Sequence, residues 1–301
     1  MIYLLLTSLI WAFSFGLIGN VLKGLDPLLV AGARLFIALL VLLPLLRPRR
    51  LSGNDRLYLL AIGAVQFGLM YSAYLSAFRF VPSHMVALFS VLTPLYVVLI
   101  HDLRQGRFTP VYLLAALLSV AGAATIKARG GETGSLWAGF GLMQISGIAF
   151  AYGQVAYRDW VQAKKMQSIG SAFKDSDGFA YLYAGGAVTA LLASFLLSPT
   201  PTQLLAASPA QMGVILYLGV VASGLGFFLW NKGASLSSPG ALAACNNALV
   251  PMAIFVSLFI FGEIRDASAN ELIRFGIGAT LIGSAVELGK RHHQAGEGPL
   301  S

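Results

Sequence analysis

Long apolar runs recur along almost the whole of the 301-residue chain, and they restrict the folds that it can adopt. About 20 consecutive apolar residues cross a bilayer as a helix. Ten such runs are present, at residues 2–20, 27–46, 57–78, 83–101, 110–126, 136–157, 178–197, 210–230, 240–261 and 271–288. Transmembrane β-strands would alternate apolar and polar residues, and a run such as 35–46 does not alternate. The sequence therefore predicts an all-α membrane protein with ten transmembrane helices.

The composition of the chain excludes an ordinary soluble protein. Charged residues make up 11% of the chain, whereas soluble domains carry about 25%. Hydrophobic residues make up 57%, and the mean hydropathy is +0.77. Met1 alone precedes the first apolar run, so we expect a retained helix rather than a cleaved secretory signal. The single cysteine, Cys245, lies inside a predicted span, so we expect neither a disulfide framework nor a CxxC motif.

The distribution of basic residues indicates the orientation in the membrane. If the N-terminus is cytoplasmic, thirteen Lys and Arg residues fall in the inner loops and the C-terminal tail. Five fall in the outer loops, namely Lys23, Arg79, Lys127, Arg129 and Arg265. Because cytoplasmic loops are enriched in Lys and Arg, we expect a multi-pass inner-membrane protein with both termini in the cytoplasm. The net charge of +8 then reflects orientation, and no nucleic-acid partner is expected.

The two halves of the chain repeat each other. In one matching pair of segments, Gly63, Val65, Gly68 and Leu69 correspond to Gly219, Val221, Gly224 and Leu225, which lie 156 positions later. Elsewhere Pro82 and Pro94 correspond to Pro239 and Pro251, and Ala12, Phe13 and Gly16 correspond to Ala149, Phe150 and Gly153. Spans one to five are thus repeated as spans six to ten. Because five is an odd number, the second repeat must be inverted in the membrane.

This duplication divides the chain into a first five-helix repeat at 1–128, a second at 136–290 and a disordered cytoplasmic tail at 291–301. Residues 158–177 are polar, and we expect them to form a solvated cytoplasmic loop, either alone or with a short surface helix within it. In transporters built from inverted repeats, the substrate site lies near the membrane midplane, at the interface of the repeats. Polar groups at that depth are therefore the candidates for a binding site.

Arg34 is the candidate with the strongest physical reason for a function. It lies seven residues after Pro27, which is about 10 Å along a helix. A buried arginine costs at least about 2.5–3.5 kcal/mol near the membrane centre. No acidic residue lies mid-span to pair with it. Arg34 either binds a substrate carboxylate in a central cavity or contacts backbone carbonyls as an anchor near the helix end.

Each repeat also places polar residues just before a proline inside a span. Asn246 and Asn247 precede Pro251, and Thr93 precedes Pro94. A proline removes a hydrogen bond within a helix, so both prolines are candidate hinges and the polar residues are candidate substrate ligands. Hydrogen bonding between helices is the alternative role of the asparagines.

Aromatic and amide side chains within the spans provide further candidates for contact with substrate. They are Trp11, Tyr71, Tyr74, Gln144, Tyr152, Trp230 and Asn231. Aromatic residues at helical spacing more often pack between helices or lie at the membrane interface, so only those that face the centre should contact substrate. An amide inside an apolar span needs a hydrogen-bond partner, which is why Gln144 is included.

Enzyme signatures are absent from the sequence. It contains neither the GxxxxGK[ST] nucleotide-binding motif nor the HExxH metal motif, and its four histidines lie at turns or in the tail. We therefore expect no catalytic residues, no cofactor and no metal site.

The duplicated spans, the WAFSFG segment at 11–16 and the stretch from Pro251 to Glu263 resemble the EamA family of the drug/metabolite transporter superfamily. The resemblance covers residues 1–290. It implies ten helices in two inverted five-helix repeats, with a central cavity that opens alternately to each side. Glu263 has no acidic counterpart in the first repeat, where span four ends in Ile100, His101 and Asp102. Segments 10–16, 91–102, 218–234 and 246–251 are similar to the YigM-type bacterial biotin transporters within this family.

These observations predict a secondary, non-ATP transporter of a small carboxylate-bearing metabolite, with biotin uptake by alternating access as the first hypothesis. Biotin would place its carboxylate on Arg34, its ureido ring on Asn246 or Asn247 and its aliphatic arm against aromatic walls. One alternative is export of amino acids or related metabolites, and another is a membrane scaffold or sensor without transport. Membrane lipid surrounds the protein in each case, and both a monomer and a homodimer are compatible with the sequence.

Overall fold

The computed structural model describes residues 2–45, 51–104, 106, 110, 114, 117, 118, 121, 122, 125, 133–167, 178–198, 203–235, 249, 250, 252–266 and 268–296. Within these residues the regular structure is helical and no strand is present, which confirms the prediction of an all-α protein. The predicted spans at 110–126 and 240–261 are only partly described, so the count of ten helices stays a prediction.

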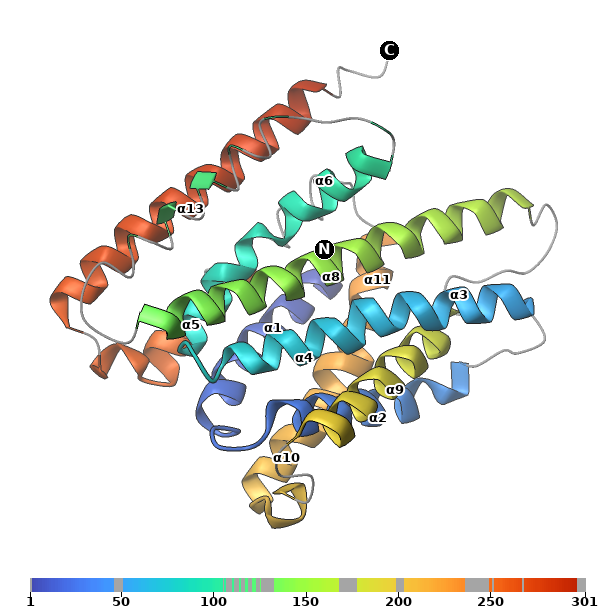
Figure 1. Ribbon diagram of the computed structural model, residues 1–301, viewed down its shortest axis with the longest axis horizontal. Helices are drawn as coiled ribbons and strands as arrows, with labels where there is room; N and C mark the ends of the chain where they lie inside the picture. Colours follow the sequence, from blue (N-terminus) through green and yellow to red (C-terminus); the bar gives the residue numbers. More distant parts are fainter. Residues whose placement is uncertain are drawn as a thin grey trace.

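The helices follow one another along the chain as shown in Figure 1. Their bounds are α1 Ile2–Asn20, α2 Pro27–Leu42, η1 Leu43–Leu45, α3 Gly53–Gly63, η3 Ala64–Leu69, α4 Met70–Ala77, α5 Ser83–Phe89, η4 Ser90–Leu92, α6 Thr93–Arg104, α8 Thr133–Gln167, α9 Phe179–Leu197, η6 Gln203–Ala206, α10 Pro209–Tyr217, η7 Leu218–Leu225, α11 Gly226–Ser235, η8 Val256–Ile260, η9 Glu263–Asp266 and α13 Ala269–Gly296. The segments η3, η7 and η8 are π-helical, and the other η segments are 3₁₀ helices.

Capping residues determine where two of the spans begin. Asp26 accepts a hydrogen bond from the backbone N–H of Leu28 at 2.8 Å, and Pro27 occupies the first turn of α2. Ser52 and Asp55 form a capping box at the start of α3. Such contacts satisfy N–H groups that have no partner within the helix. They explain why α3 begins at Gly53 rather than at residue 57, where the apolar run starts.

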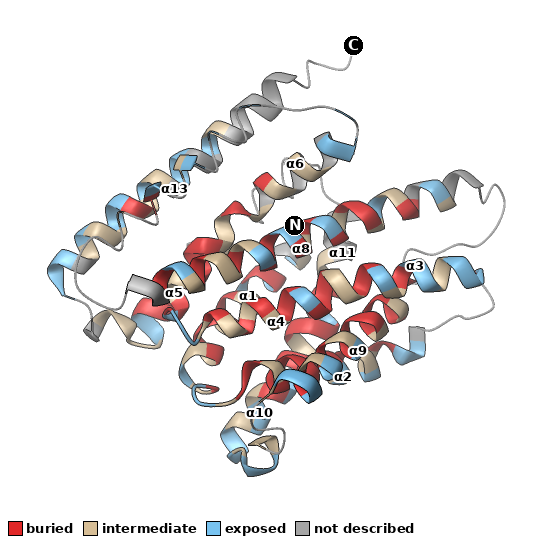
Figure 2. Ribbon diagram, in the orientation of Figure 1, coloured by how far each residue is buried: buried red, intermediate tan, exposed pale blue. Residues whose placement is uncertain are grey.

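Helices α2 and α9 pack along each other within the bundle (Figure 1). The buried core around them includes Leu35, Leu182 and Tyr183, which are almost fully buried. In Figure 2, α2 and α9 carry many buried residues, whereas α13 lies at the edge of the bundle. Arg34 belongs to the buried face of α2.

The π-helices η3 and η7 occupy corresponding positions in the two halves of the chain. They end at Leu69 and Leu225, which are 156 positions apart, the same spacing as that of the repeated segments. Their contacts are also reciprocal: η3 packs on α9, and η7 packs on α2. In the same way α4 packs on α8, and α11 packs on α1. Each half of the chain thus packs its third span against the first two spans of the other half.

The fourth span is interrupted in its interior. Helix α5 ends at Phe89, the 3₁₀ turn η4 covers Ser90–Leu92, and α6 restarts at Thr93. Pro94 follows directly, and a proline lacks the N–H that would continue the helical ladder. The backbone is thus irregular in the turn just before Pro94.

Two expectations about polar segments need correction. Residues 158–177 were expected to form a loop, alone or with a short separate surface helix, but the long helix α8 continues through Arg158 to Gln167. Helix α13 likewise runs to Gly296, into the segment expected to be disordered. In both places a helix that begins in an apolar span continues into polar sequence, because polar and charged residues such as Lys, Gln and Arg are good helix formers.

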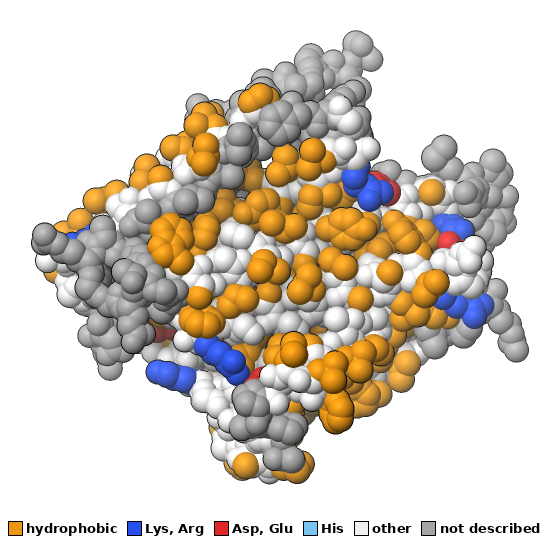
Figure 3. All heavy atoms as spheres, viewed as in Figure 1, with side chains coloured by type: hydrophobic (Ala, Val, Ile, Leu, Met, Phe, Trp, Pro, Cys, Tyr) orange, Lys and Arg blue, Asp and Glu red, His pale blue; other side chains and the backbone are white. Residues whose placement is uncertain are grey.

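The surface of the bundle suits a lipid environment. Three helical segments are long and apolar enough to cross a membrane, namely Gly53–Ala77, Phe179–Leu197 and Pro209–Trp230, and four more apolar helices are shorter. Phe195 and Leu196 on α9 are 79% and 71% exposed, which is unusual for side chains in contact with water. On the face drawn in Figure 3, apolar side chains cover the middle of the molecule and Lys and Arg lie near its edges.

Ion pairs lie at both ends of the bundle. At the end where α3 begins, Asp55 pairs with Lys164 at 2.8 Å and Arg104 pairs with Asp159 at 2.9 Å. At the opposite end, Arg79 pairs with Asp26 at 3.2 Å. Together with the apolar middle, this distribution is typical of a membrane protein.

Candidate functional site

A cavity lies between helices from both halves of the chain. Its volume is about 140 Å³, on the order of ten times the space that one water molecule needs. The described residues that line it are Trp11, Ser14, Phe15, Arg34, Met70, Tyr71, Tyr74, Ser90, Val91, Thr93, Met143, Ser146, Gly147, Phe150, Phe227, Leu249 and Val250. A cavity of this size between the two halves is a candidate substrate site rather than a packing defect.

Arg34 is the only charged residue among the described residues that line the cavity. Its side chain is 3% exposed, and Nε donates a hydrogen bond to the hydroxyl of Ser223 at 2.6 Å. Its guanidinium carbon lies 4.3 Å from the centre of the Tyr71 ring, close enough for a cation–π interaction. Arg34 is therefore a buried cation that an aromatic ring and a hydroxyl hold in place.

One end of this guanidinium remains unused. Atom Nη1 of Arg34 is buried and makes no hydrogen bond within the described part of the protein. A buried donor without a partner is costly, and more so when it carries charge. The backbone carbonyls proposed as alternative partners therefore do not satisfy Nη1. Because Arg34 lines the cavity, an anion that reached Nη1 from there would satisfy it.

The structure brings five of the candidates from the sequence to this one cavity. They are Trp11, Arg34, Tyr71, Tyr74 and Thr93. Trp11 is fixed by a hydrogen bond from its indole N–H to the carbonyl of Ala222 at 2.8 Å. Tyr74 packs edge-on against Phe15, with ring centres 5.6 Å apart. Together they provide an aromatic wall beside the one cation.

Three other candidates do not line the cavity. Tyr152 is 37% exposed on α8. Trp230 packs against the ring of Trp11, with 5.2 Å between ring centres, and so contacts a lining residue without lining the cavity itself. The amide of Gln144 accepts a hydrogen bond from the hydroxyl of Tyr96 at 2.6 Å and donates one to the carbonyl of Phe140 at 3.1 Å. Its polar groups are thus used within the protein.

The remaining candidates cannot be placed relative to the cavity. Asn246, Asn247 and Pro251 lie outside the described residues. Asn231 belongs to α11 and Pro94 to α6, but their side chains are not described. These five residues stay sequence-based candidates.

Several lining residues were not among the candidates. Ser146, Gly147 and Phe150 share one face of α8, with Ser146 and Phe150 one helical turn apart. At Gly147 the side chains of Thr93 and Tyr96 come close to the backbone of α8, since an added Cβ atom there would lie 3.2 Å from each. In the sequence, Phe150 stood out only as a member of the repeat, and Ser146 and Gly147 did not stand out.

A second cluster of polar residues lies outside the cavity, at the end of the bundle where α1 ends. The Nδ1 atom of His84 lies 2.7 Å from a carboxylate oxygen of Glu263, and the backbone N–H of His84 donates to the same carboxylate at 3.2 Å. The amide of Asn20 donates to the other oxygen at 3.3 Å. Gly262, with φ of 75°, makes the turn that leads into Glu263. This Glu263 cluster joins α1, α5 and η9.

Acid is expected to weaken the Glu263 cluster. Burial by itself raises the pKa of Glu263, but the hydrogen bonds from His84 outweigh it and hold the pKa below its ordinary value of 4.5. Because the unfolded chain then binds more protons, this contribution to stability is complete above about pH 4.5 and is lost as the pH falls through the folded-state pKa. Between about pH 6 and pH 3.5, the unfolding temperature should fall about 2–4 °C further in the wild type than in Glu263→Gln. Equal pH dependence of the two proteins would contradict this expectation.

Comparison with known proteins gives consistent matches. The model of the EamA-like transporter family matches residues 1–128. A probable biotin transporter of Pseudomonas aeruginosa is 37% identical over 297 residues, which cover 97% of this chain and 99% of that protein. Biotin transporters of Escherichia coli strain K12 and Salmonella typhimurium are 38% and 36% identical, and each match covers 87% of this chain and 85% of the relative. One crystal structure, 18% identical, shares the fold over 98% of both chains with a TM-score of 0.59.

Proposed function

The chain belongs to the EamA-like transporter family, and on that basis we propose that it carries biotin into the cell across the inner membrane. It is a membrane transporter, and we propose that it works without ATP, by alternating access, with both termini in the cytoplasm. The observation that carries the choice of substrate is the guanidinium of Arg34, because Arg34 lines the cavity and one of its buried donors has no hydrogen-bond partner among the described residues.

The reciprocal contacts between the halves support an architecture of two inverted five-helix repeats, at 1–128 and 136–290. The π-helices η3 and η7 occur at corresponding positions, and each packs on the second span of the opposite half. A rotation about a pseudo-two-fold axis in the membrane plane would exchange these contacts. In such transporters one repeat moves against the other around a shared site, which is where the cavity lies.

The charge of the cavity favours a carboxylate over an amino acid. Arg34 is cationic, and no Asp or Glu occurs among the described residues that line the cavity. A monocarboxylate would neutralise Arg34 through charge-assisted hydrogen bonds. An amino acid would in addition bury its ammonium group without a described acidic partner, which is unfavourable. This asymmetry argues against export of amino acids.

The shape and chemistry of the rest of the cavity fit a molecule with an apolar body. Phe15, Met70 and Phe150 offer apolar surface beside the arginine. The aliphatic arm of biotin could pack there while its carboxylate reaches Arg34. We propose that Asn246 or Asn247 binds the ureido ring, since an amide supplies both a donor and an acceptor. We propose further that Pro94 and Pro251 act as hinges.

Uptake by purified protein in liposomes tests the function. Liposomes that contain the protein should accumulate labelled biotin, and unlabelled biotin should abolish this uptake. An excess of amino acids should leave it unchanged, and biotinamide, which lacks the charge, should inhibit it only at far higher concentrations than biotin does. Empty liposomes are the control. Competition by amino acids would favour the exporter hypothesis, and folded protein without flux of either solute would favour a scaffold or sensor.

A further inference from the structure

Ser223 contacts Arg34 without lining the cavity. Its hydroxyl accepts the hydrogen bond from Arg34 Nε at 2.6 Å, and the side chain is fully buried. The Nε atom carries a single hydrogen, so this bond occupies the whole Nε edge of the guanidinium. A carboxylate can therefore no longer bind side-on, through Nε and one terminal nitrogen. Only the terminal nitrogens remain, and Nη1 is the donor that lacks a partner.

The ring of Tyr71 also restrains the side chain of Arg34. It lies 4.3 Å from the guanidinium carbon and so covers one face of the guanidinium. The hydroxyl of Tyr71 is also 3.4 Å from that of Ser223. The edge of the guanidinium is thus held by Ser223 and its face by Tyr71. An arginine restrained in this way presents its end to a ligand with little loss of side-chain freedom.

The π-helical form of η7 explains how Ser223 reaches this position. A π-helix forms i→i+5 hydrogen bonds, so its side chains follow a different register from those of an α-helix. The carbonyl of Ser223 accepts a hydrogen bond from the hydroxyl of Tyr183 at 3.1 Å, and that of Ala222 accepts one from Trp11 at 2.8 Å. Helices α9 and α1 therefore fix the segment on either side. Gly219 allows α2 to come close, since a side chain there would meet Ile37.

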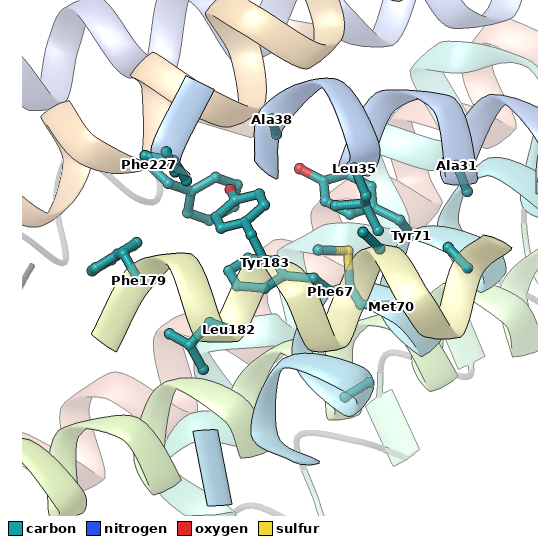
Figure 4. Close-up of a cluster of buried hydrophobic side chains, with 14 of the residues drawn as sticks. Ala31, Leu35, Ala38, Phe67, Met70, Tyr71, Phe179, Leu182, Tyr183 and Phe227 are labelled. Carbon is teal, nitrogen blue, oxygen red and sulfur yellow. The ribbon is translucent and has the colours of Figure 1, made fainter. Parts of the chain in front are cut away.

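The first half of the chain does not repeat this arrangement. The residue that corresponds to Ser223, at the spacing of 156, is Phe67 in η3. Phe67 stacks on Tyr183 with ring centres 4.5 Å apart, as Figure 4 shows. Where η7 meets α2 through a hydroxyl and a guanidinium, η3 meets α9 through two aromatic rings. The charged part of the site is thus specific to one side of the pseudo-symmetric pair.

We propose that Ser223 is a positioning residue that holds Arg34 for end-on binding of a monocarboxylate, and that it thereby sets the preference of the transporter for carboxylates over amides. The proposal rests on the proposed function, because it concerns how that site recognises its substrate. Ser223 itself does not contact the substrate. Its effect passes through the orientation of Arg34.

Kinetics of Ser223→Ala in liposomes test this role. The KM for biotin should rise about tenfold with little change in the maximal rate, because a hydrogen bond to a charged group no longer fixes the guanidinium. The ratio of the inhibition constants of biotinamide and biotin should fall by a similar factor. Ser223→Thr keeps a hydroxyl and should stay within about threefold of the wild type in both quantities. Ser257→Ala is the matched control, because Ser257 is equally buried and lies in another π-helix, η8.

A purely structural role of Ser223 would give a different result. The yield of folded protein or the maximal rate would then fall, while the KM and the preference for biotin over biotinamide stayed at wild-type values, and this outcome would overturn the inference. If the wild type takes up no biotin, the proposed function fails separately. The inference is then tested by thermal stabilisation with hexanoate against hexanamide. An equal preference for hexanoate in the wild type and in Ser223→Ala would overturn it.

Discussion

Replacement of Arg34 by methionine is expected to lower biotin uptake by at least about thirtyfold without loss of folded protein. Truncation of one partner in a desolvated, hydrogen-bonded charge pair costs about 2–5 kcal/mol, and each 1.4 kcal/mol is a factor of ten. Stability should respond differently, because the free protein holds the Arg34 charge buried with no acidic partner among the described residues. Methionine removes that charge and fills a similar volume. The unfolding temperature should therefore stay within about 3 °C of the wild-type value or rise.

Arg274→Met is the matched control for this variant. Arg274 is a partly buried arginine of α13 that does not line the cavity, so the same substitution there should leave the KM for biotin unchanged. Uptake rates at several biotin concentrations, together with thermal unfolding of the purified proteins, give both quantities. A wild-type KM in Arg34→Met would exclude Arg34 as the carboxylate ligand. A large drop in unfolding temperature would instead identify it as a structural anchor.

The general character of the fold follows from the sequence because it depends on local composition. Apolar runs with few charges must become helices in lipid, where every backbone N–H and C=O needs an internal partner. The spacing of 156 between repeated glycines also predicted which segments correspond, and the π-helices η3 and η7 end at that spacing. The helical extension of α8 to Gln167 was missed because polar residues can continue a helix as well as form a loop.

The site was less predictable because it depends on contacts between distant parts of the chain. Arg34 stood out from the sequence since a charge within an apolar run is costly wherever it lies. Ser223 did not, because serines are common in transmembrane helices and its role arises only where η7 meets α2. Tyr152 and Gln144 had plausible side chains, but the neighbours of α8 decide which of its faces meets the cavity. That information is not present in the local sequence.

The close approach of α3 and α9 predicts the largest loss of stability. A Cβ atom added at Gly63 would lie 1.9 Å from the carbonyl oxygen of Leu182. One added at Gly185 would lie 2.0 Å from the carbonyl oxygen of Leu60, so the two helices meet backbone to backbone at both glycines. Backbone atoms cannot rotate away as side chains do, and small residues are what permit such packing in lipid. Gly63→Ala must therefore push the helices apart.

We expect Gly63→Ala to cost at least about 3 kcal/mol, which lowers the unfolding temperature by about 6–12 °C or prevents recovery of folded protein. The corresponding substitution Gly219→Ala should be milder, because the added atom would meet Cβ and Cγ2 of Ile37 at 2.6 Å and its nearest backbone atom, the carbonyl oxygen of Arg34, at 3.1 Å, rather than lying directly against a backbone carbonyl. Gly276→Ala is the control, since nothing lies within 4 Å of the added atom. Size-exclusion profiles and thermal unfolding in detergent measure the series. If all three variants behaved alike, α3 and α9 could not lie as close together as the structure places them. The packing of each half of the chain on the other would then lack support at this contact.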